Sequence, residues 1–308
     1  MQNNLMKYKQ YFLAVPIILS LLSIGALLAW GLKPGIDLAG GSFLEVSYSA
    51  SSTAPTSEQV HDAAAASGIA DSRVQPTGNN GFILRSRDLT NDEHQALLKS
   101  LGTLGGVTQV QFNSVGPTIG AELLQKAYIA IALVIISIII FIAFAFRGVS
   151  RPVASWKYGV VAIITLVHDI LIPTGLFALL GQTHNAEVDS LFIVALLTIL
   201  GISINDTIVV FDRIRENLRK NQDKSKHEEF DVVVSKSIKQ TLTRSINTSV
   251  AVLIVLAALW ALGPASTRDF ALTLIVGMVA GTYSSIFLAS PLLVVWNDFS
   301  HRNSGKKK

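Results

Sequence analysis

Long apolar stretches separated by polar segments are the main feature of the chain. A bilayer core needs roughly 20 consecutive apolar residues per helix. Six stretches qualify or nearly qualify: 12–32, 127–146, 158–180, 191–211, 246–262 and 270–296. The fifth is short, and we expect its helix to begin a few residues earlier, near Thr243. The pattern therefore predicts an α-helical membrane protein with six transmembrane helices, of which helices 2–6 occupy residues 127–296.

The first apolar stretch is expected to be an uncleaved membrane anchor. Lys7 and Lys9 precede it, as basic residues precede the apolar core of a signal peptide. Its apolar run of about 21 residues is longer than the roughly 7–15 residues of such a core. We therefore interpret residues 12–32 as transmembrane helix 1.

Composition supports a membrane protein and excludes several other classes. Of the 308 residues 50% are hydrophobic and 15% are charged, and the mean hydropathy is +0.47. Soluble domains carry about 25% charged residues. Because so few charges could not cover a soluble globule, the composition excludes a cytosolic enzyme, a disordered regulator and a free nucleic-acid binder. The chain has no cysteine, which excludes disulfides, thiol catalysis and cysteine metal sites.

The basic residues indicate which side of the membrane each polar segment faces. Of the 25 Lys and Arg residues, 18 lie in the N-terminus, the 147–157 loop, the 212–245 loop and the C-terminus. Cytoplasmic loops collect Lys and Arg. Both termini, residues 1–11 and the basic tail 297–308, are therefore predicted to be cytoplasmic. Six of the other seven basic residues lie in the long segment 33–126, where charge affects orientation little.

Residues 33–126 are predicted to form an extracytoplasmic α+β domain between helices 1 and 2. Capping boxes at 56–59 and 90–93 start two helices. The order of elements is βαββαβ, a ferredoxin-like arrangement. We see no catalytic cluster in this segment, and we expect His61 and His94, one on each helix, to be solvated. The strand patterns cover 42–49, 73–77, 82–87 and 107–112, with a hairpin-turn signal at 78–81.

Four ionisable residues lie inside the predicted spans or at their ends. His168 and Asp169 are near mid-depth in the third span, Asp206 is in the fourth, and Arg244 is at the cytoplasmic start of the fifth. Polar groups at membrane depth are costly and usually functional. The directions of the spans put Asp206 and Arg244 at comparable depth, so we expect them to pair if spans four and five are neighbours.

These four residues are the candidates for a proton relay. A low-dielectric surrounding favours the neutral form of a carboxyl group, and a nearby arginine favours its charged form. A carboxyl group between these influences can gain and lose a proton as the helices move. The alternative is a static buried ion pair that fixes helix packing, and for His168 a role only as the hydrogen-bond partner of Asp169. The run 212–217 is interpreted as a solvated or subunit-contacting helix end.

Gly277 and Gly281 form a small-xxx-small face in the sixth span, continued by Ser284, Ser285 and Ala289. In lipid such a face lets helix backbones approach closely. Helix packing is therefore the preferred interpretation, and contact with a substrate is the alternative.

Five motifs carry a family resemblance over nearly the whole chain. They are residues 35–41, 115–120, 201–217, 241–246 and 281–287, of which the 201–217 run containing Asp206 is the most specific. In this order, and with six spans, they resemble the SecF family, the smaller subunit of the bacterial SecD–SecF protein-export complex. One departure is Leu38-Ala39, where the family more often has Phe-Thr.

The resemblance implies a role in protein export across the bacterial plasma membrane. SecF-like chains resemble half of a proton-driven transporter of the RND type and pair with SecD to give twelve spans. The pair assists the SecY–SecE–SecG channel after the ATPase SecA has pushed a preprotein in, and proton flow resets external domains that hold the emerging chain. By motif, Asp206 and Arg244 match the residues linked to proton passage, and His168-Asp169 resembles a polar pair of this helix. No cofactor and no nucleic acid is implied.

The sequence favours protein export over three alternatives. A small-molecule exporter of the RND type would share the membrane architecture, but the external segment is too small for a drug pocket. An intramembrane aspartyl protease using Asp169 and Asp206 would need a Gly-x-Gly-Asp motif, which the residues before Asp206 do not provide. A structural assembly factor would not need a carboxylate and an arginine at membrane depth. The chain has no P-loop, so nucleotide hydrolysis is not expected to be its own energy source.

Overall fold

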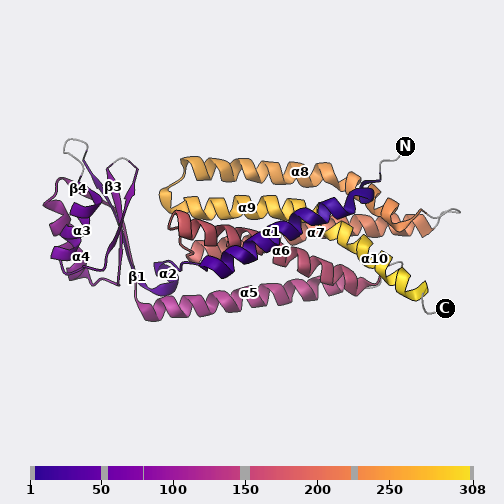
Figure 1. Cartoon of the computed structure of the whole chain (residues 1–308), viewed down its shortest axis with the longest axis horizontal. Helices are drawn as coiled ribbons and strands as arrows, with labels where there is room; N and C mark the ends of the chain where they lie inside the picture. Colours follow the sequence, from indigo (N-terminus) through magenta and orange to yellow (C-terminus); the bar gives the residue numbers. More distant parts are fainter. Residues whose placement is uncertain (1–3, 50–54, 79, 146–152, 223–227, 306–308) are drawn as a thin grey trace. The chain divides into compact units, whose positions relative to one another are not determined.

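The computed structural model describes residues 4–49, 55–78, 80–145, 153–222 and 228–305. These residues form two compact units (Figure 1). The helical unit comprises Met1–Lys33, Ala130–Glu187 and Leu191–Lys308, and the sheet unit comprises Pro34–Ile129 and Val188–Ser190. Several residues used for the predictions above lie outside the described residues: Asn79 of the hairpin turn and the basic residues Arg147, Arg151, Lys224, Lys226, Lys306, Lys307 and Lys308.

Six helices in the described part of the chain are long and apolar enough to cross a membrane, as predicted. A short 3-10 helix, η1 (Leu5–Tyr8), precedes the first. The sixth span is divided between two helices. The helices are α1 (Lys9–Trp30), α5 (Pro117–Ala145), α6 (Ser155–Thr183), α7 (Ser190–Gln222), α8 (Phe230–Leu262), α9 (Ala265–Phe287) and α10 (Ala289–Gly305).

The division of the sixth span has a local cause. α9 ends at Phe287 and α10 begins at Ala289, with Leu288 between them. Pro291 follows in the first turn of α10. Proline has no N–H to donate to the carbonyl four residues earlier, here Phe287, and its ring clashes with that carbonyl. The chain therefore restarts its helix instead of continuing α9.

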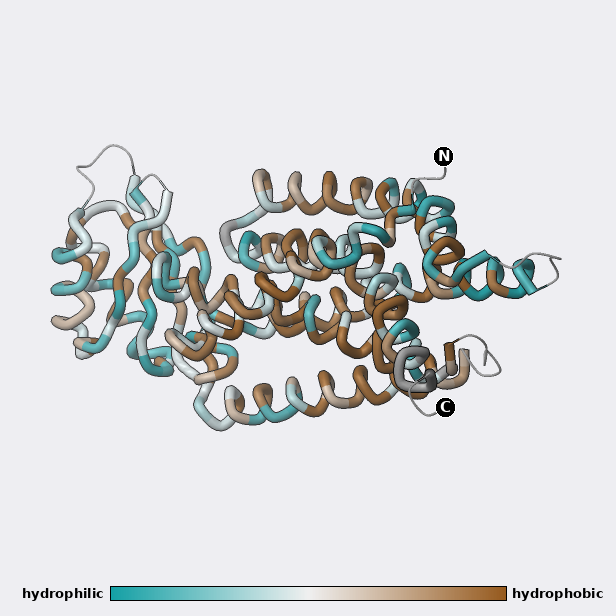
Figure 2. The backbone as a smooth tube through the Cα atoms, turned by 45° about the vertical axis from the view of Figure 1, so that its right-hand side comes forward, coloured by the Kyte–Doolittle hydropathy of each residue, from teal (hydrophilic) through white to brown (hydrophobic). Residues whose placement is uncertain are grey.

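The segment 212–245 is mostly helical and is not the long loop that was predicted. α7 continues to Gln222 and α8 already begins at Phe230. Glu216 forms ion pairs with Arg213 and with Lys220, 2.6 Å away, at the spacings that stabilise helices. Figure 2 shows the consequence, because the tube turns from hydrophobic to hydrophilic toward this end of α7 and α8. Helix formation therefore extends beyond the apolar part of both spans.

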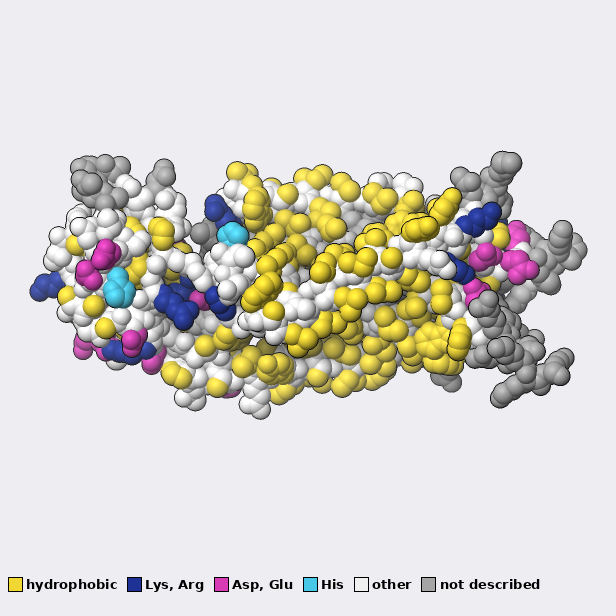
Figure 3. Space-filling model, viewed as in Figure 1, with side chains coloured by type: hydrophobic (Ala, Val, Ile, Leu, Met, Phe, Trp, Pro, Cys, Tyr) yellow, Lys and Arg dark blue, Asp and Glu magenta, His cyan; other side chains and the backbone are white. Residues whose placement is uncertain are grey.

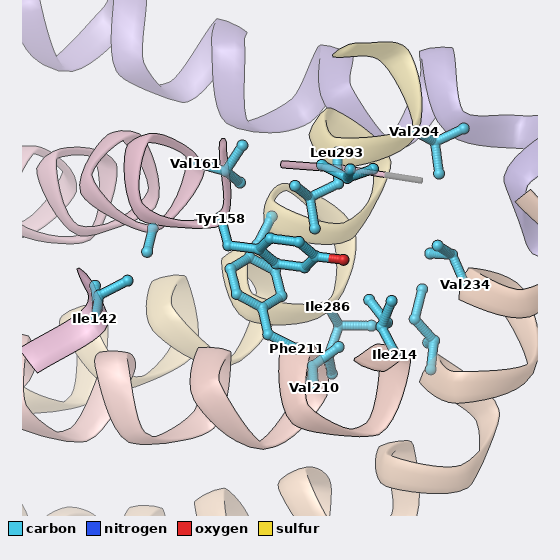
Figure 4. Close-up of a cluster of buried hydrophobic side chains, with 14 of the residues drawn as sticks. Ile142, Tyr158, Val161, Val210, Phe211, Ile214, Val234, Ile286, Leu293 and Val294 are labelled. Atoms are coloured by element: carbon cyan, nitrogen blue, oxygen red, sulfur yellow. The ribbon is translucent and has the colours of Figure 1, made fainter. Parts of the chain in front are cut away.

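A cluster of buried apolar side chains joins helices α5 to α10 (Figure 4). The rings of Tyr158 and Phe211 meet edge to face with centroids 5.2 Å apart, and Ile142, Ile286 and Leu293 are fully buried around them. Because lipid tails are as apolar as these side chains, close packing and not transfer from water stabilises the cluster. The outer surface is apolar as well, and Figure 3 shows hydrophobic side chains over most of the visible face of the helical unit.

The sheet unit has the predicted order of elements. One antiparallel sheet has the strand order β2-β3-β1-β4. Helices α3 and α4 cover one face of this sheet (Figure 1). Between that face and the helices lies a core that includes Leu44, Val46, Leu97 and Leu101. The elements are α2 (Ile36–Ala39), β1 (Gly41–Tyr48), α3 (Ser57–Ala66), β2 (Arg73–Thr77), β3 (Gly81–Ser86), α4 (Asn91–Gly102) and β4 (Val107–Val115).

Both predicted capping boxes are present. The Thr56 hydroxyl accepts a hydrogen bond from the Gln59 N–H at 3.2 Å, and the Gln59 side chain accepts one from the Thr56 N–H at 2.9 Å. Thr90 and Glu93 repeat this reciprocal pair at the start of α4. Because each box satisfies N–H groups that a helix leaves free, the two helix starts are determined locally.

Two of the sequence motifs meet in the sheet unit. Gly40 has a φ of +79°, which L side chains rarely adopt, and an added Cβ there would lie 2.7 Å from Cα of Pro117. A Cβ added at Gly120 would lie 2.7 Å from the backbone nitrogen of Gly40. The glycines of motifs 35–41 and 115–120 therefore allow two backbone segments to touch, which explains why larger residues do not fit there.

One expectation for the sheet unit is wrong. His61 is exposed as predicted, but His94 is buried, with 6% of its surface exposed. The His94 ring stacks on Phe112 with centroids 3.6 Å apart, and its Nε2 lies 3.0 Å from Oε1 of Gln109. His94 shares a helix face with Leu97 and Leu101 at spacings of three and seven residues. That spacing, and not the polarity of the side chain, determines its burial.

Candidate functional site

A buried polar cluster joins helices α6, α7 and α9 inside the helical unit. Asp169 of α6 has no exposed surface, and His168 is only 5% exposed. Nδ1 of His168 lies 2.9 Å from one carboxylate oxygen of Asp169, and the Ser203 hydroxyl of α7 donates a hydrogen bond to the other. Both oxygens therefore have partners, which a buried carboxylate requires. Among the described residues, Nε2 of His168 has no hydrogen-bond partner.

The second predicted acid, Asp206, lies on α7 one turn after Ser203, and it is half-buried. The Ser245 hydroxyl of α8 lies 3.5 Å from its Oδ1. Arg244 is exposed, and no salt bridge joins it to Asp206 in the described part of the chain. Helices α7 and α8 are neighbours, which was the condition for pairing, but Asp206 contacts Ser245 and not Arg244.

The two acids are connected through one segment of α7. Ser203, which binds Asp169, and Asp206 are three residues apart and therefore share a helix face. Both line a cavity of about 10 Å³, together with Gly277, Gly281 and Thr282 of α9. A volume of roughly 10–15 Å³ holds about one water molecule. The arrangement can therefore link the two carboxylates through a hydroxyl and a single water.

The predicted small-residue face lies against this cluster. A Cβ added at Gly277 would overlap the side chain of Ile199 on α7. At Gly281 it would lie 3.2 Å from Cβ of Ser203 and 3.7 Å from Oδ2 of Asp169. Glycine at these positions lets α9 approach α7 closely. This geometry supports helix packing as the role of both glycines, and the assignment stays a prediction.

Hydroxyl side chains were missed by sequence reasoning. Ser203 and Ser245 stand inside the motifs quoted above without an assigned role, and Ser249 and Thr282 pair at 2.6 Å between α8 and α9. A signal was available, because Ser203 precedes Asp206 by one turn and Ser245 follows Arg244 directly. Serine also occurs widely in helices where it only bonds its own backbone. The spacing alone therefore could not select these residues.

Comparison with known proteins agrees with this architecture. Residues 94–298 match the family described as protein export membrane protein SecD/SecF, C-terminal. The protein translocase subunit SecF of Thermobaculum terrenum is 39% identical over 305 residues, which cover 95% of this chain and 92% of that protein. The SecF of Anaerolinea thermophila is 38% identical over 307 residues, covering 99% of this chain and 97% of that protein.

A solved structure shows the same fold. The crystal structure of SecDF, a translocon-associated membrane protein from Thermus thermophilus, matches with a TM-score of 0.81 at 32% identity. The match covers 97% of this chain, which in turn spans 39% of the SecDF chain. Full-length similarity to SecF subunits and a shared membrane fold lead to one conclusion: the chain belongs to the SecD/SecF family of protein export membrane proteins, as a SecF-type member.

Proposed function

We propose that this protein is the SecF subunit of a bacterial Sec translocase. In complex with SecD, it uses the proton motive force to promote late, ATP-independent steps of preprotein translocation. The observation that carries the proposal is the Asp169–Ser203–Asp206 arrangement inside the helical unit of a chain that matches SecF subunits over nearly its full length. Carboxyl groups at membrane depth are costly unless they serve a function such as proton transfer.

The partnership with SecD is supported by the SecDF relative. Because this chain spans 39% of SecDF, the SecF-like part of that protein is one segment of a longer polypeptide. Parts that are fused in one relative are expected to associate when they are separate chains. The SecY–SecE–SecG channel, SecA and the preprotein are proposed as further partners on the family resemblance alone.

The proposed topology follows the distribution of basic residues. We place the protein in the bacterial plasma membrane with both termini, 1–11 and 297–308, in the cytoplasm. Helix 1 (12–32) and helices 2–6 (127–296) cross the bilayer, and 33–126 form an extracytoplasmic ferredoxin-like domain. The βαββαβ order and the β2-β3-β1-β4 sheet support this domain type.

Asp206 is the proposed proton carrier, and Arg244 stabilises its charged form from a distance. Asp169 and His168 form a second, buried polar pair that the cavity beside Ser203 connects to Asp206. One charge crossing 100 mV releases about 2.3 kcal/mol. A few protons per cycle could therefore drive a rigid-body change between two packed states.

The same geometry argues against an aspartyl protease. Such an enzyme needs two carboxylates close enough to share one proton. Both oxygens of Asp169 are bound by His168 and Ser203, while Asp206 contacts Ser245. In the described part of the chain, no hydrogen bond joins the two carboxyl groups. We therefore propose a transport subunit and not an enzyme.

The names of the relatives, protein translocase subunits, favour protein over small-molecule export.

The test is completion of preprotein translocation in inverted membrane vesicles, with and without a proton gradient. Wild type and Asp206→Asn are each co-expressed with SecD, and complex formation is checked by co-purification. Asn keeps the size of the side chain and removes its titratable proton. We expect the variant to assemble with SecD and to lose the gradient-dependent step. Normal gradient-dependent completion by the assembled variant would show that Asp206 is not the proton carrier.

A further inference from the structure

Three residues of the connection between α6 and α7 belong to the sheet unit. Val188–Ser190 group with Pro34–Ile129, whereas the residues on either side of them group with the helical unit. Ser190 is also the first residue of α7. The sheet unit therefore contains the start of the helix that carries Asp206.

Backbone contacts hold this short segment beside Pro34 and Gly35. Val188 forms a parallel β-bridge with Pro34, and the Val188 carbonyl accepts a hydrogen bond from the Gly35 N–H at 2.8 Å. Val188 and Gly35 are both buried. Buried backbone groups need hydrogen-bond partners, so this contact is costly to open. The connection is therefore fixed to the sheet unit at Val188.

A side chain adds a second contact, at the start of α7 itself. Oδ2 of Asp37 accepts a hydrogen bond from the Ser190 N–H at 3.4 Å, across 153 positions of the sequence. The first N–H groups of a helix have no partner within that helix, and a carboxylate complements the positive end of the helix dipole. Asp37 is therefore a capping group that a distant part of the chain supplies to α7. We call these contacts the α7 clamp, formed by Pro34, Gly35, Asp37, Val188 and Ser190.

The segment that carries Asp37 also meets the start of a second membrane helix. Asp37 lies in α2, inside the motif 35–41. Gly40 of the same motif lies against Pro117, the first residue of α5. One short motif therefore contacts the first residues of both α5 and α7. These contacts give a structural role to a motif whose sequence pattern did not reveal one.

α7 is suited to carry a displacement from the clamp to the membrane acid. It is one helix from Ser190 to Gln222, and no proline interrupts its backbone hydrogen bonds. Asp206 follows Ser190 by 16 residues, which is a rise of about 24 Å. Rigid secondary elements transmit displacement between distant sites. A shift or rotation of α7 at Asp206 therefore reaches its first residue.

We propose that the α7 clamp stays closed during transport and that Asp37 is a positioning residue within it. The closed clamp makes the start of α7 move together with the sheet unit. A displacement of α7 at Asp206 then moves that unit as a rigid body. Asp37 acts on this process through the first residue of α7. The inference rests on the proposed function, because it links the proposed proton carrier to the external segment.

A reversible disulfide tests whether the clamp stays closed, because the chain has no cysteine of its own. Paired strands lie about 4.8 Å apart, within the Cα separation of about 4.4–6.8 Å that a disulfide spans. The double variant Pro34→Cys/Val188→Cys is co-expressed with SecD, and inverted vesicles are oxidised with diamide or reduced with dithiothreitol. Mass spectrometry quantifies the disulfide independently of export. The two single-cysteine variants are the controls for the lost side chains.

We expect the disulfide to form and the oxidised vesicles to keep gradient-dependent translocation, because the cross-link only fixes a contact that is already closed. A disulfide that abolishes translocation until it is reduced would overturn the proposal, since it would show that the clamp has to open. Failure of the disulfide to form in the assembled complex would overturn it as well, because the two bridge partners would then not be adjacent.

Substitution of Asp37 tests the contribution of its side chain. Asp37→Ala removes the acceptor, and we expect about a fivefold fall in the gradient-dependent rate, as for the loss of one hydrogen bond. Translocation without a gradient and co-purification with SecD should not change. Asp37→Asn keeps an acceptor and should resemble wild type. Lys33→Ala removes a neighbouring exposed hydrogen bond to Asn185 and should do the same.

Rescue by the disulfide distinguishes positioning from a general structural role. Adding Pro34→Cys/Val188→Cys to Asp37→Ala should restore most of the lost rate after oxidation and not after reduction. A wild-type rate in Asp37→Ala, or no rescue by the disulfide, would overturn the role of Asp37.

The same variants separate this inference from the proposed function. A fully active Asp206→Asn, together with a slow Asp37→Ala that the disulfide rescues, would keep the clamp and reject the proton role of Asp206. An inactive Asp206→Asn together with a wild-type rate in Asp37→Ala would do the reverse.

Discussion

The Ser245 hydroxyl lies 3.5 Å from Oδ1 of Asp206, so the residue after Arg244, and not Arg244 itself, contacts the membrane carboxylate. Helix α8 turns about 100° per residue, so the exposed guanidinium and the buried hydroxyl that faces α7 lie on different sides of the helix. Asp206 therefore has a neutral hydrogen-bond donor, the Ser245 hydroxyl, close to its carboxylate, while the positive charge of Arg244 lies further away. This arrangement leaves the carboxyl group free to be protonated, which a tight ion pair would oppose.

Replacing Ser245 tests the contact. Ser245→Ala removes the donor, and we expect the gradient-dependent translocation rate to fall by about tenfold or less, since a hydrogen bond contributes about 1 kcal/mol. Ser245→Thr keeps the hydroxyl and should stay close to wild type. The measurement is the translocation rate in inverted vesicles. A complete loss in Ser245→Ala, equal to that of Asp206→Asn, would contradict the view that the serine only assists.

Asp169 distinguishes a relay from a static polar pair. Asp169→Ala leaves His168 and Ser203 without their shared partner, and we expect a loss of about 3–5 kcal/mol in stability, read as a lower unfolding temperature in detergent. Asp169→Asn retains an acceptor and should fold. If the folded Asn variant loses gradient-dependent translocation, Asp169 carries protons. Wild-type translocation by this variant would assign Asp169 a packing role.

Gly277 is predicted to be intolerant of any side chain. Gly277→Ala would push its methyl group into Ile199, and overpacking of this kind costs about 1–3 kcal/mol. Gly201→Ala is the matched control, because no atom lies within 4 Å of an added Cβ there, and it should be neutral or stabilising. Thermal unfolding of the purified complex measures both. Adding Ile199→Ala to Gly277→Ala should restore part of the lost stability. If the double variant is no more stable than Gly277→Ala, overlap with Ile199 is not the cause of the loss.

His94 is predicted to be part of the core of the sheet unit. His94→Ala removes the stacked ring on Phe112 and the contact with Gln109, and we expect a loss of about 2–5 kcal/mol, in the range of truncations of large side chains in cores. His61→Ala, at an exposed position of α3, should change stability little. Hydrogen exchange of the β1 and β4 amides in the full-length protein reports the difference. Equal exchange in the two variants would be inconsistent with a buried His94.

Glu93 gives the sheet unit a pH dependence. The hydrogen bond and charge of Arg87, with the hydrogen bonds of Thr90, lower the pKa of Glu93 from 4.5 to about 2. A carboxyl group with a lowered pKa stabilises the fold above pH 4.5, and this contribution disappears as the pH falls toward about 2. Glu93→Gln keeps the cap but loses the ion pair, so its α4 amides should exchange faster than wild type at neutral pH. The two proteins should converge near pH 2. A constant difference between them at all pH values would exclude this ion pair as the source.

Local patterns in the chain were sufficient for most of the fold. The six spans follow from the length of apolar runs, and both helix starts in the sheet unit follow from capping boxes whose partners are three residues apart. The predicted positions of Asp169 and Asp206 within their spans also follow from local sequence. Each residue adds a fixed rise along a helix, so the residue number gives the depth. The predicted depth of each acid therefore depends on the sequence alone.

The partners of those acids depend on the tertiary structure. Lipid and neighbouring helices are equally apolar, so hydropathy does not show how a membrane helix is rotated about its axis. Only the packed helices show that Ser203 bonds Asp169, that Ser245 and not Arg244 contacts Asp206, and that Ser203 and Asp206 line one small cavity. The burial of His94 was likewise decided by the residues that cover its helix face. Depth and element type are properties of short segments, whereas rotation and contact arise from all the helices together.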